Sequence, residues 1–416
     1  MARKKNNRRK KPAQQANGGY KKFIRELYDT LRLAGIDQLW NENTDADKHL
    51  MYSMRIRIQN PVACNDLVSS AELKRIAVQT KRYFREPTVE RKKDKFSAYQ
   101  LMLLYCYLAV REQVITRNLG NKNDPVVLER REHKNKMLDQ FGINCILGHF
   151  RIMIQLGSPD YKYFGLALRH AAIYKESPSM EMVPDIYGIP AEKKIICMDG
   201  HKRPAYRLGK PDGMEIFKWS VVASNTLGDA YTGDKKKLDI YIQSHALKRM
   251  AQRLDLLKRP AINYALWENT ITISSFVHHR GKLLLPVKIY DTKIGYLVAE
   301  VADDVLLFKT FLFITHNFTP EGDTLRRISG LGKEDISYWK IDRLSTFVNL
   351  DTGKYPALSG LFEQAGLANI FQLKDKDFDV EQMQEANLDG LMRYIERGKN
   401  ADTIQKQEFE ALLQNA

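Results

Sequence analysis

The chain has 416 residues, of which 44% are hydrophobic and 10% aromatic, and its formal net charge at pH 7 is +16. This length predicts two or three domains with real apolar cores. No stretch reaches about 18 uncharged apolar residues and no apolar segment follows the basic N-terminus, so the composition argues against a membrane span and a secretory leader. We therefore expect a cytoplasmic protein whose excess positive charge favours a polyanionic partner such as RNA or DNA.

Four cysteines lie far apart and form no Cys-x-x-Cys pair. They are Cys64, Cys106, Cys145 and Cys197. Cysteine zinc sites usually need close pairs, and disulfide scaffolds need a denser framework. The pattern favours reduced thiols, and we expect neither a metal nor another cofactor.

The first 19 residues predict a disordered basic arm. Residues 2–11 carry seven positive charges and no acid, and the polar stretch "PAQQANGG" follows as a flexible linker. The predicted phosphate contacts are Arg3, Lys4, Lys5, Arg8, Arg9, Lys10 and Lys11, which would gain affinity by counterion release. The alternatives are a tail that only aids solubility and, in a eukaryotic source, a nuclear address.

Residues 20–177 have a helical pattern and predict an α-helical domain. Phe23, Leu27 and Leu31 recur at steps of four, with Gly35 as the stop of that helix. Further helices are predicted over residues 69–84, 97–120, 125–142, 145–157 and 161–175. The second of these is the most apolar, which predicts the centre of a bundle. Three prolines within residues 177–190 predict the domain boundary.

The next section, residues 193–242, predicts short strands and turns, notably "KKIICMDG" and "EIFKWSVVAS". The loop "YRLGKPDGM" could touch phosphate, but an ordinary hairpin connection is favoured because it lacks the Gly-Lys-Ser/Thr ending of a P-loop. At the other end, residues 351–416 predict a helical, acidic segment. Its apolar stripe of Leu388, Leu391, Met392 and Ile395 is typical of core.

The clearest order lies within a predicted α+β module, residues 190–350. The strand "DIYI" precedes the amphipathic helix "HALKRMAQRLDLLK", with Ser244 as its expected N-cap and Pro260 in the first turn of a second helix. Four antiparallel strands follow, namely "TITISSFVH", "LLLPVKIY", "GYLVAEVA" and "VLLFKTFLFIT", with "HRGK" and "DD" as turns. Pro286 predicts an edge or a bulge in the second of these strands. The chain is therefore predicted to be an α+β protein.

The start "SHALKRM" and this element order resemble small bacterial toxin-like domains of the barnase–EndoU–colicin–RelE group of metal-independent ribonucleases. The resemblance covers residues 238–316, under a quarter of the chain. It implies RNA, more than DNA, as the partner, and a RelE-like fold. The module is internal and the chain is several times longer than a free-standing toxin, so a degenerate copy that serves only as a fold is the alternative.

Metal-independent RNA cleavage needs a base for the 2′-hydroxyl proton, an acid for the leaving oxygen and cations for the phosphorane charge. His245, Arg249 and Arg253 lie at four-residue steps and so share one helix face. Histidine can exchange a proton near neutrality, and arginine grips phosphate oxygens. We expect His245 to be the base and the two arginines to be phosphate clamps.

Two further groups complete the predicted site. "ITHNFTPEG" offers Thr315 and His316 as acid or positioning residues, and the hairpin tip "VHHRG" offers His278, His279 and Arg280 as nucleic-acid contacts. The plain alternative is that these are solvated polar residues. Asp199, Asp303 and Asp304 have no partner at ligand spacing, so a two-metal nuclease is disfavoured.

Two function classes stay open. One is an RNA-binding protein with metal-independent ribonuclease activity. The other is a non-enzymatic nucleic-acid-binding accessory or virion protein of a phage or mobile element. The sequence names no protein partner.

Overall fold

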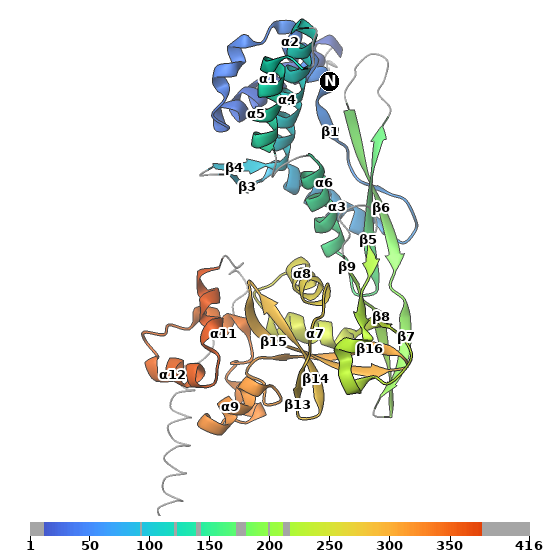
Figure 1. The fold of residues 1–416 in the computed structure, drawn as a ribbon, viewed down its shortest axis with the longest axis vertical. Coiled ribbons are helices and arrows are strands. Elements are labelled where there is room, and N and C mark those ends of the chain that lie inside the picture. The colour runs from blue at the N-terminus through green and yellow to red at the C-terminus, as the bar shows by residue number, and fades with distance from the viewer. Residues whose placement is uncertain are drawn as a thin grey trace, which may run out of the picture. The chain divides into compact units, whose positions relative to one another are not determined.

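The computed structural model describes residues 12–91, 94–119, 123–138, 143–171, 180–198, 200–210 and 217–376. Helices and strands both contribute, which confirms the α+β class (Figure 1). The chain divides into two compact units that alternate along the sequence. Unit 1 comprises Met1–Ile154, Gly165–Gly188 and Gly213–Ile216, and unit 2 comprises Gln155–Phe164, Ile189–Asp212 and Phe217–Ala416.

Most helices of unit 1 pack around α4. The helices are α1 (Pro12–Leu33), α2 (Asp45–Met54), α3 (Ser70–Arg85), α4 (Ala98–Leu119), α5 (Pro125–Leu138) and α6 (Ile143–Leu156), with a 3₁₀ turn at Asp37–Glu42. Because α4 contacts α1, α2, α3 and α5, the predicted centre of the bundle is confirmed.

The predicted stop of the first helix is confirmed, and a side-chain cap begins α3. Gly35 has φ +69° just after α1, a conformation that glycine adopts without strain. The Ser69 side chain caps α3 and forms a reciprocal capping box with Glu72. One prediction is wrong: residues 12–19, expected as a flexible linker, belong to α1.

Unit 1 also contains strands, most of them within residues 20–177, where the sequence predicted an α-helical domain. The strands are β1 (Ile56–Ile58), β2 (Val62–Ala63), β3 (Pro87–Arg91), β4 (Asp94–Ser97), β5 (Lys162–Ala171) and β6 (Met180–Pro190). Strand β6 pairs in parallel with β1 and β2 and also pairs with β5. The helix expected over residues 161–175 is wrong, because Lys162, Phe164 and Leu166 are buried at alternate positions, the period of a strand.

Unit 2 is built on an eight-stranded sheet in the order β13-β14-β15-β16-β12-β8-β7, with β11 paired to β12. Its strands are β7 (Lys193–Met198), β8 (His201–Arg207), β11 (Val221–Ala223), β12 (Lys237–Gln243), β13 (Val277–His279), β14 (Lys282–Ile289), β15 (Thr292–Ala302) and β16 (Val305–Phe313). A small hairpin joins β9 (Gly209–Lys210) to β10 (Lys218–Trp219), and Ser224–Ala230 forms a 3₁₀ turn. Strand β12 runs parallel to β16, and β13 to β16 form the predicted meander.

The turns of the meander have two residues each with positive φ, as in type I′ turns. They are Arg280–Gly281, Tyr290–Asp291 and Asp303–Asp304. The predicted "HRGK" and "DD" turns are therefore confirmed. The predicted first strand is shorter than expected, because helix α8 continues to Thr270 and only Val277–His279 pairs with β14. A register shift follows Val287, next to Pro286.

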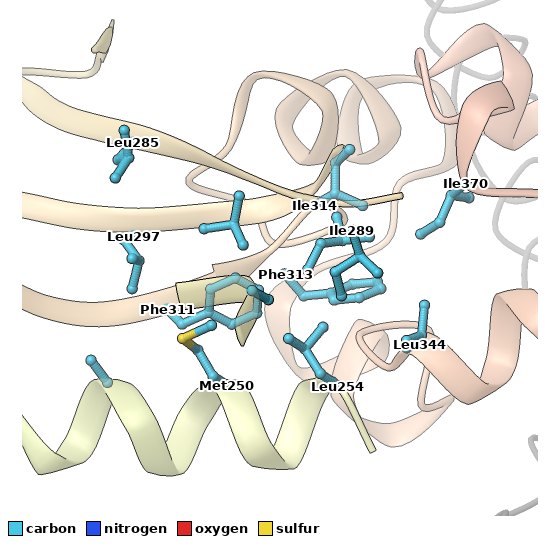
Figure 2. Close-up of a cluster of buried hydrophobic side chains, with 14 of the residues drawn as sticks. Met250, Leu254, Leu285, Ile289, Leu297, Phe311, Phe313, Ile314, Leu344 and Ile370 are labelled. Atoms are coloured by element: carbon cyan, nitrogen blue, oxygen red, sulfur yellow. The ribbon is translucent and has the colours of Figure 1, made fainter. Parts of the chain in front are cut away.

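Helices α7 (Ser244–Arg253) and α8 (Arg259–Thr270) bury their apolar faces against the meander. Met250 of α7 and Leu254 at its C-terminal cap point toward the sheet, where Phe311 and Phe313 lie above them (Figure 2). The predicted apolar side of α7 is thus confirmed. The expected N-cap is wrong: β12 runs straight into α7, so Gln243 is the N-cap and Ser244 is already helical.

The helices that follow the meander, residues 320–375, pack against this hydrophobic core. Its helices are α9 (Pro320–Ser329), α10 (Lys333–Tyr338), α11 (Leu344–Asn349) and α12 (Pro356–Gln364), followed by a 3₁₀ helix at Ala368–Asp375. Leu344 and Ile370 face the same core as Ile314 (Figure 2). Among the described residues, no helix is long and apolar enough to cross a membrane.

The predicted basic arm, residues 2–11, and the predicted apolar stripe that includes Leu388 lie outside the described residues.

Candidate nucleic-acid interface

Helix α7 positions two of the predicted residues at its surface. His245 is exposed in the first turn, and Arg249 is half-buried one turn later. Burial, and then the charges of Arg249, Arg203 and Lys248, lower the pKa of His245. A neutral imidazole near pH 7 can accept a proton, so the chemistry expected of a base is available at this position.

Arg253 has a different task from the one predicted. Its guanidinium forms an ion pair with the buried carboxylate of Asp342, and only 17% of the Arg253 side chain is exposed. Two turns of α7 after His245, Arg253 is therefore an anchor for the segment that precedes α11. Asp255 adds to this anchor, because its carboxylate accepts hydrogen bonds from the backbone and hydroxyl of Ser345 at 3.0 and 2.6 Å. Arg253 was predicted as a phosphate clamp, whereas the structure places its guanidinium in this ion pair with Asp342.

Thr315 is also structural. Its side chain is fully buried, and its hydroxyl donates to the Ile341 carbonyl at 2.7 Å. A hydroxyl sealed in this way cannot reach a substrate. The sequence could not separate it from His316, because both follow directly on the last strand.

His316 lies near several positively charged side chains, among them the predicted Arg249 and Arg253. Burial, and then the charges of Lys333, Arg253, Lys282 and Arg249, lower its pKa to about 4. Its Nδ1 accepts the backbone N–H of Phe318 at 3.3 Å, so the proton of the neutral ring is on Nε2. At neutral pH this ring is a hydrogen-bond donor among positive charges.

Three members of this group were not predicted from the sequence, namely Lys282, Phe318 and Lys333. Lys282 follows the two-residue turn of the β13–β14 hairpin, and its Nζ lies 5.0 Å from the centre of the Phe318 ring. Phe318 is 40% exposed, so part of its ring is open to solvent. The turn signal could have pointed to Lys282, but nothing in the sequence near Lys333 indicates its position.

We call Arg249, Lys282, His316, Phe318 and Lys333 the His316 patch. Within the part of the chain that the structure describes, no carboxylate forms an ion pair with Arg249, Lys282 or Lys333. Arg249 donates only to the amide oxygen of Gln252, at 3.2 Å. The patch therefore offers three uncompensated cations, one neutral N–H donor and an aromatic face.

The predicted hairpin tip is largely neutralised. Asp323 of α9 accepts both His279 Nε2 and Arg280 Nε at 2.7 Å. His278 is exposed on β13. His279 and Arg280, predicted as nucleic-acid contacts, thus hold the tip to α9 through Asp323. The guanidinium of Arg280 also lies over the Phe318 ring, 5.6 Å from its centre.

Within the described ranges, no three His, Cys, Asp or Glu side chains gather as metal ligands would. Comparisons with protein-family models, with curated proteins and with solved structures found no match.

Proposed function

We propose that this protein binds nucleic acid, RNA in preference to DNA, and that the His316 patch contacts its phosphates. The observation that supports the proposal most is the grouping of Arg249, Lys282 and Lys333 around His316 without carboxylate partners. Such cations neutralise phosphates and release counterions, which provides most of the affinity for a polyanion. The exposed Phe318 ring adds a surface on which a base can stack.

Replacing Arg249 with alanine is expected to weaken RNA binding about tenfold, because one charge-assisted phosphate contact is lost. The slope of log affinity against log salt should also become shallower by about 1. Fluorescence anisotropy with a labelled single-stranded RNA between 50 and 300 mM salt measures both quantities.

The matched control is Lys288→Ala. Lys288 is exposed on β14, six residues along the strand from Lys282. If the two variants bind RNA equally well, the His316 patch is not the phosphate contact.

The second candidate function is RNA cleavage without a metal ion, and one observation favours it. Arg249 lies close enough to both His245 and His316 to lower the pKa of each. A phosphate held by Arg249 would thus lie near both a proton acceptor, His245, and an N–H donor, His316. The strand, two helices and meander of residues 238–316 also resemble the toxin-like ribonucleases in element order.

A cleavage reaction of this kind should proceed in excess chelator and should lose at least about 100-fold in rate in His245→Ala, the usual contribution of a general base. Gel analysis of labelled RNA measures the rate, and circular dichroism checks that the variant folds. RNA that stays intact while it binds tightly would leave the non-enzymatic, accessory function as the conclusion.

A further inference from the structure

Unit 1 contains a groove that the proposed function does not use. It has a volume of about 630 Å³ and lies between β1 and α3. Its lining residues are Arg55, Ile56, Arg57, Ile58, Gln59, Asn60, Ala77, Val78, Thr80, Lys81, Phe84, Arg85 and Tyr99. A volume of this size is typical of sites that hold small ligands.

Four basic side chains line this groove. Arg55 directly precedes β1, Arg57 lies within it, and Lys81 and Arg85 lie one turn apart on α3. Lys81 and Arg85 share a helix face because they are four residues apart. The chain therefore brings four cations to one hollow from two elements.

Acidic side chains compensate only part of this charge. Arg57 pairs with Glu181 at 3.2 Å, and Arg85 pairs with Glu26 at 3.6 Å. Lys81 is exposed, and no carboxylate among the described residues forms an ion pair with it. Arg55 lies over the ring of Tyr52, with its guanidinium carbon 3.5 Å from the ring centre. The groove thus has positive charge available for an anion.

The same groove offers surfaces for a base. The guanidinium of Arg85 stacks over the Tyr99 ring at 4.3 Å, so ring and cation form one platform. Gln59 and Asn60 are exposed at the end of β1 and carry amide groups that can both donate and accept hydrogen bonds. Aromatic platforms beside a cationic groove are the usual means of holding unpaired bases.

We propose that this groove, formed by β1 and α3, binds single-stranded nucleic acid. Lys81 and Arg55 contact the phosphates, and a base stacks on the Tyr99–Arg85 platform. An acidic peptide would use the cations but would need neither the aromatic platform nor the amides. A duplex keeps its bases paired and stacked, so it cannot offer one to the platform. The groove lies in unit 1 and is a second site, separate from the His316 patch in unit 2.

The test compares Lys81→Glu with Lys21→Glu, which makes the same charge change at an exposed residue of α1 outside the groove. The probe is a labelled 12-nucleotide RNA, measured by anisotropy against salt, and circular dichroism confirms that each variant folds. Lys81→Glu should weaken binding about tenfold and make the salt slope shallower by about 1, while Lys21→Glu should change neither beyond about twofold. Equal effects of the two variants overturn the proposal.

A second pair tests the platform. Tyr99→Leu should weaken binding about tenfold, and Tyr99→Phe, which keeps the ring but loses the hydroxyl bonded to Glu26, should not. A 4-thiouridine oligonucleotide should crosslink within residues 55–60, 77–85 or 99. Crosslinks confined to unit 2 would also overturn the proposal. The same holds if a glutamate-rich peptide binds in place of RNA and its binding weakens in Lys81→Glu. Because Arg249→Ala probes unit 2 alone, failure of the groove and failure of the His316 patch are distinguishable.

Discussion

Asp342→Ala is expected to lower the free energy of unfolding by about 3–5 kcal/mol, because the variant leaves the Arg253 guanidinium without its carboxylate partner. The side chain of Asp342 is 5% exposed, and burial raises its pKa despite the nearby charge of Arg253. Burial likewise is the main cause of the lowered pKa of Arg253. The two charges compensate each other in a place that water reaches poorly, and removing Asp342 leaves the buried Arg253 charge without a partner. Urea denaturation followed by circular dichroism measures the loss.

The double variant Arg253→Met, Asp342→Leu is the informative control. Replacing both partners by apolar groups of similar size should recover most of the stability that Asp342→Ala loses, because no buried charge remains. A loss below about 1 kcal/mol in Asp342→Ala would show that the ion pair contributes little. If Arg253→Met instead weakened RNA binding as much as Arg249→Ala, Arg253 would be a phosphate contact after all.

This ion pair also shows where sequence reasoning reaches its limit. The four-residue steps of His245, Arg249 and Arg253 correctly predict a shared face of α7. They cannot tell what packs against the far end of that face. The partner, Asp342, comes 89 positions after Arg253, and only the tertiary fold brings it there.

The same limit explains the strand that was predicted as a helix. Residues 162–171 have apolar side chains at spacings that satisfy both the helical and the strand period, and strand β5 forms because β6 provides a pairing partner. By contrast, the meander of unit 2 was predictable, because alternating apolar residues and two-residue turns both act locally. The local sequence pattern therefore predicted that His316 follows the last strand, β16. Lys333 belongs to α10, and its position beside His316 depends on the tertiary fold.

The stability of the folded chain is expected to fall as the pH is lowered from about 7 to about 4, with His316 contributing about 2–3 kcal/mol to the loss. The pKa of the ring is about 4 in the folded chain and near 6.5 in the unfolded chain, so within this range the unfolded chain binds the proton first. Protonation thus draws the equilibrium toward the unfolded state. At a pH well below 4 both states are protonated, and this contribution stops changing.

The charges that face His316 come from three elements, namely Arg249 and Arg253 of α7, Lys282 of β14 and Lys333 of α10. Burial is nevertheless the largest cause of the lowered pKa, and salt screens charges but does not change burial. Raising the salt concentration should therefore move the pKa of His316 up only in part. An RNA phosphate bound beside the ring should move it further, because an anion favours the imidazolium form. Titration of the imidazole resonances by NMR, with and without RNA, measures each shift.

His316→Asn separates this ring from the other titrating groups. The asparagine carbonyl can accept the Phe318 N–H in place of Nδ1 but binds no proton in this range, so the pH-dependent loss of stability should shrink by the same 2–3 kcal/mol. The carboxylates and the other histidines contribute equally to the pH–stability curves of the wild type and His316→Asn. Their contributions therefore cancel in the difference between the two curves. His278→Asn, at an exposed position on β13, should leave the curve unchanged.

Equal curves for the wild type and His316→Asn would mean that the ring is as well solvated in the folded chain as in the unfolded one. The His316 patch would then lack the partly buried, anion-accepting environment on which the proposed phosphate contact depends.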